Sequence, residues 1–156
     1  MTTQKRNAAK RKLNARVKVL AEFRYRLRRF LSFSEEAAEA AGTSAQQYQL
    51  LQVVAAASQR EQASISYIAE RMVLRHNSAV ELVGRVERSG LIRRQEDATD
   101  HRRALITLTA EGEALLERLV SRHWAELERQ GPELLKALEQ LLSDEAAGEK
   151  QGSEIG

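Results

Sequence analysis

The chain has 156 residues, of which 42% are hydrophobic and 30% charged, a composition typical of a folded domain that can bury a core. It contains no cysteine, which excludes disulfides and thiol-based redox sensing, and its three histidines are too scattered to predict a zinc site. The long uncharged stretch at residues 42–59 contains five glutamines. We therefore expect no membrane-spanning helix and a cytoplasmic protein.

The net charge of +3 conceals a strong asymmetry between the two ends of the chain. Residues 1–30 contain eleven basic residues and one acidic residue, whereas residues 110–156 contain five basic and eleven acidic residues. The basic segment can bind nucleic acid phosphates or pair with the acidic segment, within one subunit or between two. We favour pairing from Arg16 onward and leave both alternatives open for Lys5–Lys12. Residues 1–11 are predicted to be a flexible basic arm and residues 146–156 a flexible tail.

Helical periodicity begins the folded part of the chain. It predicts a first helix over residues 12–32, from the spacing of Leu13, Val17, Leu20, Leu27 and Leu31. Gly42 interrupts the pattern, and Ser44 with Gln47 predicts a capping box at the start of a second helix, residues 45–57. That helix places Tyr48, Leu51 and Val54 on one face, and Ala55–Ala57 suits close packing.

Residues 63–90 predict two short helices joined by a tight connection. Either Ser64 or Ser66 can cap the first, residues 67–73, which turns Ile68, Ala69 and Met72 inward. The second, residues 76–89, turns inward the apolar side chains of Ala79, Val80, Val83 and Val86. Its other face is polar and carries Asn77, Ser78, Glu81 and Arg85, and Gly90 follows at a position that ends helices. This pattern fits a helix-turn-helix and an ordinary helical hairpin equally well.

The next residues favour the helix-turn-helix. Two short strands, residues 91–95 and 104–108, flank a charged loop and predict a β-hairpin in the place of a wing. Thr109 caps a helix that runs to about residue 130, and Gly131-Pro132 is expected to break the chain before a last helix at 132–145. The predicted fold class is mainly α with a small β-hairpin wing. It comprises an N-terminal dimerisation helix within 12–42, a winged helix-turn-helix DNA-binding lobe at 43–109 and C-terminal dimerisation helices at 110–145.

Three motifs carry a resemblance to a known family: Gly90-Leu91-Ile92-x-Arg94, Asp100-x-Arg102 and Ile106-x-Leu108-Thr109-x-x-Gly112. In order and spacing they resemble the wing and the following helix of the MarR (multiple antibiotic resistance regulator) family, and the resemblance covers about residues 12–145. It implies a homodimeric, ligand-responsive repressor that binds double-stranded DNA and a small aromatic or phenolic effector. Two features depart from the family: Gly84 stands where the family often has Asp, and the long basic N-terminus is not part of its core pattern.

The candidate site residues follow from what DNA binding requires, namely short polar groups for base edges and cationic groups for phosphates. Arg75, His76, Asn77 and Ser78 cluster at the start of the recognition helix, where Asn77 or Ser78 could instead cap it. Arg85 could reach a phosphate or pair with Glu81, and Arg94 and Arg103 are candidates for backbone contacts. The resemblance implies that Arg102 enters the minor groove. Asp100, two residues before it, points the same way in a strand, so we expect it to support the wing without touching DNA. Candidate residues for an effector cleft are Arg24, Arg28, Tyr48 and Trp124.

Other classes of function are weaker. An enzyme is not expected, because the sequence shows no metal cluster, no glycine loop for phosphates and no nucleophilic triad, and no cofactor is predicted. His123 is interpreted as a packing residue. The alternative is a helical protein–protein adaptor, which has no need of a basic hairpin. A two-fold dimer predicts a pseudo-palindromic operator.

Overall fold

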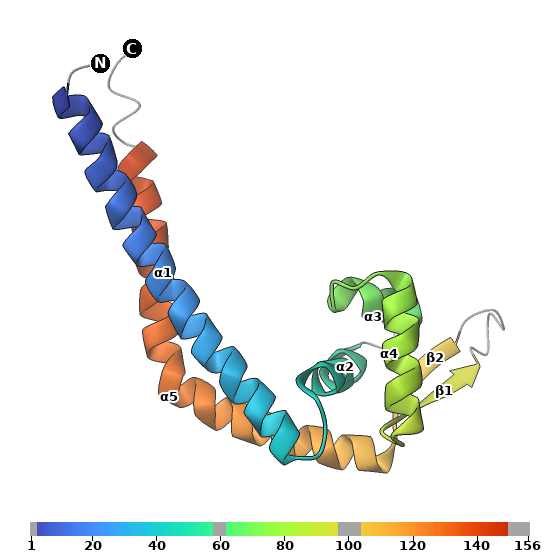
Figure 1. The fold of residues 1–156 in the computed structure, drawn as a ribbon. Coiled ribbons are helices and arrows are strands. Elements are labelled where there is room, and N and C mark those ends of the chain that lie inside the picture. Colours follow the sequence, from blue (N-terminus) through green and yellow to red (C-terminus); the bar gives the residue numbers. More distant parts are fainter. Residues whose placement is uncertain (1–2, 58–61, 97–103, 150–156) are drawn as a thin grey trace. The chain divides into compact units, whose positions relative to one another are not determined.

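The computed structural model describes residues 3–57, 62–96 and 104–149 and is mostly helical with one small hairpin (Figure 1). The elements in chain order are α1 (Thr3–Ala40), α2 (Ala45–Ala56), α3 (Ile65–Arg71), α4 (His76–Arg88), β1 (Ile92–Glu96), β2 (Ala104–Leu108) and α5 (Ala110–Glu149). Contacts divide the chain into a two-helix unit, Met1–Phe33 with Trp124–Gly156, and a winged unit, Ser34–His123. The predicted fold class is confirmed. None of the helices in the described residues has the length and apolar character that a membrane crossing requires.

The core of the winged unit is built mainly by α2, α3 and α4, with further buried side chains from α1, β1, β2 and α5. Its largest fully buried side chains are Tyr48, Leu50, Leu51, Ile68, Leu82, Val83, Val86, Ile92 and Leu119. The predicted capping box of α2 is confirmed, because Ser44 Oγ accepts from the N–H of Gln47 and Gln47 Oε1 accepts from the N–H of Ser44. The expected packing of Ala55–Ala57 is wrong: Ala55 and Ala56 are exposed and Ala57 is half-buried. These alanines follow Val54, the last buried residue of the helix.

The hairpin is antiparallel, with Ile92 opposite Leu108 and Arg94 opposite Ile106. A third short segment joins it: Ser64 bridges to Leu105, and the N–H of Ile106 donates to the Ala63 carbonyl over 2.9 Å. The capping role predicted for Ser64 is confirmed, because its Oγ accepts from the N–H of Tyr67. Its contact with the sheet was not predicted. Ser64 therefore ties the start of α3 to the sheet.

Helix α1 is longer at both ends than the predicted 12–32. Its last turns contain Ala37 and Ala38, which are buried in the winged unit, and it ends where the N–H of Thr43 donates to the Ala38 carbonyl beside Gly42 (φ +80°). Residues 34–40 have only small and acidic side chains, so the periodicity of large apolar residues underestimates this helix. Alanine is nevertheless the strongest helix former, and its small side chain permits close packing.

Helix α5 continues through Pro132, so the predicted break at Gly131-Pro132 is wrong. Proline removes one helical hydrogen bond and crowds the carbonyl four residues earlier, which usually bends a helix and does not have to end it. Side-chain contacts hold α5 on both sides of this position. Before it, Glu126 binds Arg129, and after it Glu133 lies 3.6 Å from Arg26 of α1.

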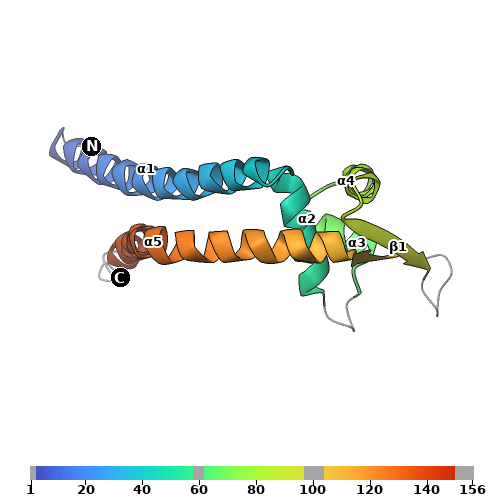
Figure 2. The same cartoon turned by 90° about the horizontal axis from the view of Figure 1, so that it is seen from below.

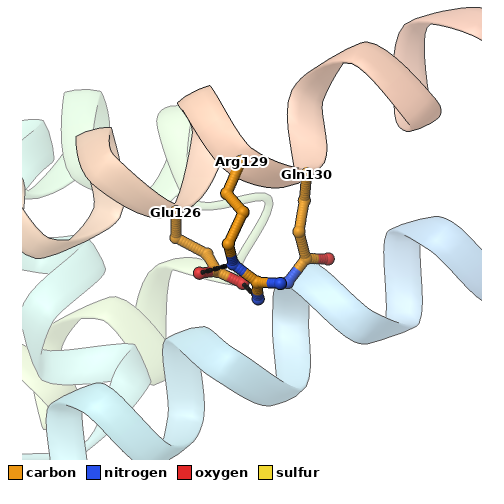
Figure 3. Close-up of polar contacts among 3 residues, drawn as sticks. All are labelled: Glu126, Arg129 and Gln130. Carbon is orange, nitrogen blue, oxygen red and sulfur yellow. Dashed lines mark hydrogen bonds and ion pairs between the residues drawn. The ribbon is translucent and has the colours of Figure 1, made fainter.

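In the two-helix unit, α1 and the second half of α5 run antiparallel and side by side, with both chain ends at the same end of the pair (Figures 1 and 2). Glu126 is the most buried carboxylate of this unit among the described side chains. It lies on the side of α5 that faces α1 and accepts from Arg129 Nε over 3.0 Å, from Arg129 Nη2 and from Gln130 Nε2 (Figure 3). Hydrogen bonding by Arg129 is the main reason that the pKa of Glu126 is lowered.

Candidate nucleic-acid interface

Helices α3 and α4 form the helix-turn-helix. Helix α3 ends in a turn in which the N–H of Val73 donates to the Glu70 carbonyl and that of Leu74 to the Ala69 carbonyl. Val73 adopts φ +53° with its side chain 92% exposed. This left-handed conformation is the one that a tight helix end requires, and it is unfavourable for a β-branched residue.

The buried and exposed faces of α4 are sharply separated. The buried face consists of Ala79, Leu82, Val83 and Val86. The polar side chains predicted on the other face, Asn77, Ser78, Glu81 and Arg85, are all exposed. The expectation that Val80 points inward is wrong, since 38% of it is exposed. At 100° per residue, Val80 projects far from the buried stripe, and Leu82 takes the inward place.

The first turn of α4 is accessible. Arg75 occupies the N-cap position, and within the described residues no side chain caps this helix, so Asn77 and Ser78 do not serve as caps. The side chains of Arg75, His76, Asn77 and Ser78 are all exposed. Free backbone N–H groups and the positive end of the helix dipole favour an anion at such a position.

Two of the predicted phosphate-binding arginines have partners in the winged unit. Arg85 Nη2 donates to Gln46 Oε1 of α2 over 3.3 Å, which is neither of the two alternatives considered for it. Arg94 Nε lies 3.0 Å from Glu87 Oε2, and the backbone N–H of Arg94 donates to Glu87 Oε1. Arg85 therefore lies on α4 and Arg94 lies beside it, and their contacts with DNA stay a prediction.

Two guanidinium groups lie above Gly84, and their pairing was not predicted from the sequence. A Cβ atom placed on Gly84 would lie 3.5 Å from Arg88 Nη1 and 3.7 Å from Arg94 Nη2. Arg88 is exposed on the same face of α4 as Asn77 and Glu81. Helical geometry was the available signal, because residues 77, 81, 84 and 88 share one face.

The structure describes the two strands of the wing but not the loop at residues 97–103. Arg93 Nε donates to Thr107 Oγ1 across the hairpin over 3.2 Å. The predicted groove-binding Arg102, the backbone candidate Arg103 and the supporting Asp100 lie outside the described residues. Their roles therefore stay predictions.

The glycine and threonine of the wing motifs join the end of α4 to the start of α5. Gly90 adopts φ +78°, and its carbonyl accepts from Thr109 Oγ1 over 2.6 Å. Thr109 also accepts from the N–H of Gly112, which confirms it as the cap of α5, and its own N–H donates to the Leu91 carbonyl. Gly90 and Thr109 are therefore structural and hold the hairpin in place after α4.

His123 belongs to a buried polar cluster of the winged unit, as its interpretation as a packing residue predicts. Its Nδ1 lies 2.7 Å from the Leu119 carbonyl and its Nε2 2.9 Å from Ser34 Oγ. Its ring stands 4.6 Å from that of Tyr48, which accepts a hydrogen bond from Gln52. Burial raises the pKa of the Tyr48 hydroxyl.

A cleft of about 910 Å³ opens in the winged unit between the end of α2, the hairpin and the first half of α5. Apolar side chains such as Val54, Leu105 and Leu116 line it together with polar groups of Arg93 and Ser121. None of the four predicted effector residues lines this cleft: Tyr48 is buried elsewhere in the winged unit, and the exposed Arg24, Arg28 and Trp124 belong to the two-helix unit.

The helix-turn-helix followed directly by a hairpin defines the winged unit as a winged helix-turn-helix domain. Residues 41–103 match the sequence profile of the MarR family. Over 70 residues the chain is 37% identical to "Transcriptional regulator HosA" of Escherichia coli, a match that covers 45% of this chain and half the length of that relative. The resemblance to the MarR family is confirmed over residues 41–103.

Two solved structures extend the comparison. The MepR–DNA complex of S. aureus is 27% identical, with a TM-score of 0.57 over 78% of this chain and 95% of MepR. CouR of Rhodococcus jostii RHA1, bound to p-coumaroyl-CoA, is 29% identical, with a TM-score of 0.57 over 64% of this chain and 68% of CouR.

Proposed function

We propose that this protein is a sequence-specific DNA-binding transcription regulator that acts in the cytoplasm as a ligand-responsive repressor. The observation that carries the proposal is α4, whose polar face and uncapped first turn are exposed while its opposite face is buried. This is the construction of a recognition helix that enters a major groove. The similarity to MepR, solved with DNA, supports the same target.

Each part of α4 suits a different contact. Asn77 in the first turn can form the paired hydrogen bonds that identify adenine, and Arg88 further along the same face can do so for guanine. The exposed methyl groups of Val80 suit contact with a thymine methyl group. Arg75 and the backbone N–H groups of the first turn are placed for phosphate, and we assign the minor groove to Arg102.

The active form in this proposal is a homodimer. Large apolar side chains of the two-helix unit are exposed in the single chain, including Leu13 (61%), Val17 (55%), Leu135 (57%) and Leu142 (60%). Exposed apolar rows on paired helices are typical of an interface, and covering them with a second copy gives a two-fold axis. Two recognition helices then reach successive major grooves about 10 bp apart, so the operator is pseudo-palindromic.

The cleft beside the hairpin is the proposed place for a small effector. Apolar walls line it together with the guanidinium of Arg93 and the carboxylates of Glu113 and Glu117. The walls suit an aromatic ring, and Arg93 is the group that can bind the anionic end of a phenolic or carboxylate ligand. CouR, a relative solved with p-coumaroyl-CoA, supports an aromatic acyl group as one class of ligand. A ligand between α5 and the hairpin would favour a dimer whose recognition helices no longer match the operator spacing.

The decisive experiment selects, from genomic DNA, the fragments that the protein binds. The affinity of the protein for these fragments is then compared with its affinity for random duplex DNA at two salt concentrations. We expect a pseudo-palindromic site and an affinity that falls with salt. Asn77→Ala should lower the ratio of operator affinity to random-DNA affinity. The matched variant Gln49→Ala, which removes an exposed amide from α2, should leave this ratio unchanged. An affinity that is independent of salt would favour the alternative, a protein–protein adaptor.

A further inference from the structure

The winged unit supplies little of the positive charge that DNA binding requires. Residues 34–109 contain nine basic and ten acidic residues, so this part of the chain has no net positive charge. Binding to duplex DNA depends on cationic groups that replace the counterions of the phosphates. Most of the excess positive charge in this protein lies in residues 1–30.

The first turns of α1 carry this charge on an ordered helix. Residues 5–18 contain seven basic residues and no acidic residue, and all fourteen side chains are exposed. At 100° per residue, Lys5, Lys12 and Arg16 lie within about 40° of one another and form a row about 16 Å long. We call these three residues the basic row.

The basic row does not coincide with the apolar surface of α1. Leu13, Val17 and Leu20 are exposed side chains that lie about a quarter turn around the helix from the row. A helix that covers this apolar stripe therefore leaves the basic row at the edge of the contact. The row can stay accessible in the homodimer.

The neighbouring helix of the same unit compensates only part of the charge. Arg26 faces Glu133, and because the helices are antiparallel, residues 10–18 of α1 are level with about residues 141–149 of α5. That segment of α5 contains three acidic residues, Asp144, Glu145 and Glu149, against five basic residues at 10–18. Lys5 and Arg6 lie beyond its last helical residue, and a positive surplus remains at this end of the pair.

We propose that the basic row binds the phosphate backbone of duplex DNA outside the base pairs read by α4. The proposal rests on the proposed function and adds a second, sequence-independent contact to it. Phosphates are its target because a row of flexible cationic side chains matches a line of like charges and carries no group that distinguishes bases.

The test is the triple variant Lys5→Gln/Lys12→Gln/Arg16→Gln. Glutamine keeps the helix propensity of lysine and arginine while removing the charge. The matched control, Arg118→Gln/Arg122→Gln/Lys136→Gln, removes three exposed charges from α5 and causes the same change in net charge. Affinity is measured across salt concentrations on the selected operator extended by about 20 bp on each side, and on random duplex of equal length.

Each lost phosphate contact should lower the slope of log affinity against log salt by about 0.9, so we expect the triple variant to lose at least about two units per protomer. The loss of affinity should be equal on operator and random DNA, and the control should keep the wild-type slope. Circular dichroism and thermal melting verify folding. If the triple variant does not fold, Lys5→Gln alone, in the first turn of α1, should still lower the slope by about one unit.

A triple variant with the slope of the control would overturn the inference. A lower melting temperature with an unchanged slope would show that the row pairs with the acidic residues of α5. These outcomes leave the proposed function intact, provided that the wild-type protein selects an operator. The proposed function fails separately if the wild-type protein binds no DNA.

Discussion

A Cβ atom on Gly112 would lie 2.0 Å from the carbonyl oxygen of Leu91. The first turn of α5 and the residue before β1 are therefore in direct backbone contact, and only glycine fits between them. The N–H of Thr109 donates to the same Leu91 carbonyl. The position of the wing after the recognition helix depends on this contact.

Gly112→Ala should lower the free energy of unfolding by about 3 kcal/mol, because the added methyl group forces two backbone segments apart. Urea denaturation measures this change. Gly131→Ala is the matched control on the same helix, since no described atom lies within 4 Å of its Cβ position. That control should be neutral or stabilising by up to about 1 kcal/mol. Equal effects of the two substitutions would contradict the assigned role of Gly112.

Different substitutions of Gly84 should affect stability and DNA binding separately. Gly84→Ala should stabilise the protein by about 1 kcal/mol, because its Cβ would make only ordinary contacts with Arg88 and Arg94. Gly84→Asp would place a carboxylate beside both guanidinium groups and should weaken DNA binding about fivefold, or about 1 kcal/mol. Gly84→Asn supplies the uncharged control and should bind more tightly than the Asp variant. Fluorescence anisotropy with labelled operator distinguishes these outcomes.

Val73 is strained in the turn between α3 and α4. Because its φ is +53° and its side chain is 92% exposed, Val73→Gly should raise the free energy of unfolding by about 1 kcal/mol with almost no loss of burial. Val73→Ala keeps a Cβ atom and should change stability less. A destabilised glycine variant in thermal melting would be inconsistent with this strain.

Glu126 should make the stability of the two-helix unit depend on pH. Its pKa is lowered, chiefly by hydrogen bonding from Arg129, so its contribution is present above the pKa of an unfolded glutamate. The contribution is lost as the pH falls through the lower pKa of the folded state. Glu126→Gln should therefore reduce stability at neutral pH and approach the wild type in acid. Denaturation at a series of pH values tests this; a constant difference between the two proteins would refute it.

Arg102 should contribute to DNA affinity through the minor groove. Arg102→Ala is expected to cost about 1–3 kcal/mol of binding and to reduce the salt slope by about one unit. Asp100→Ala should also weaken binding, because the wing loses the residue that supports it. Affinity measured across salt concentrations, with circular dichroism to verify folding, checks both variants. A folded Arg102→Ala protein with unchanged affinity and slope would show that the wing does not insert into DNA.

The order of elements and several of their ends were predictable from local chemistry. Ser44 with Gln47, Ser64 and Thr109 cap helices through contacts within three or four residues, and Gly42 and Gly90 end helices with a positive φ. Such contacts depend only on neighbours in the chain. The polar face of α4, with Asn77 and Ser78 exposed, followed from the same helical spacing that identified its apolar face.

Only the tertiary structure decided features that depend on distant residues. The two guanidinium groups above Gly84 come from α4 and β1, and Gly112 meets Leu91 from another element. Helix α5 continues through Pro132 although local preference predicts a break, and just after the proline Glu133 lies beside Arg26 of α1. Hydrophobicity alone placed Val80 in the core, whereas the packing of α4 selects Leu82. Local sequence determines where backbone hydrogen bonds start and stop, and only the packing of elements determines which side chains lie together.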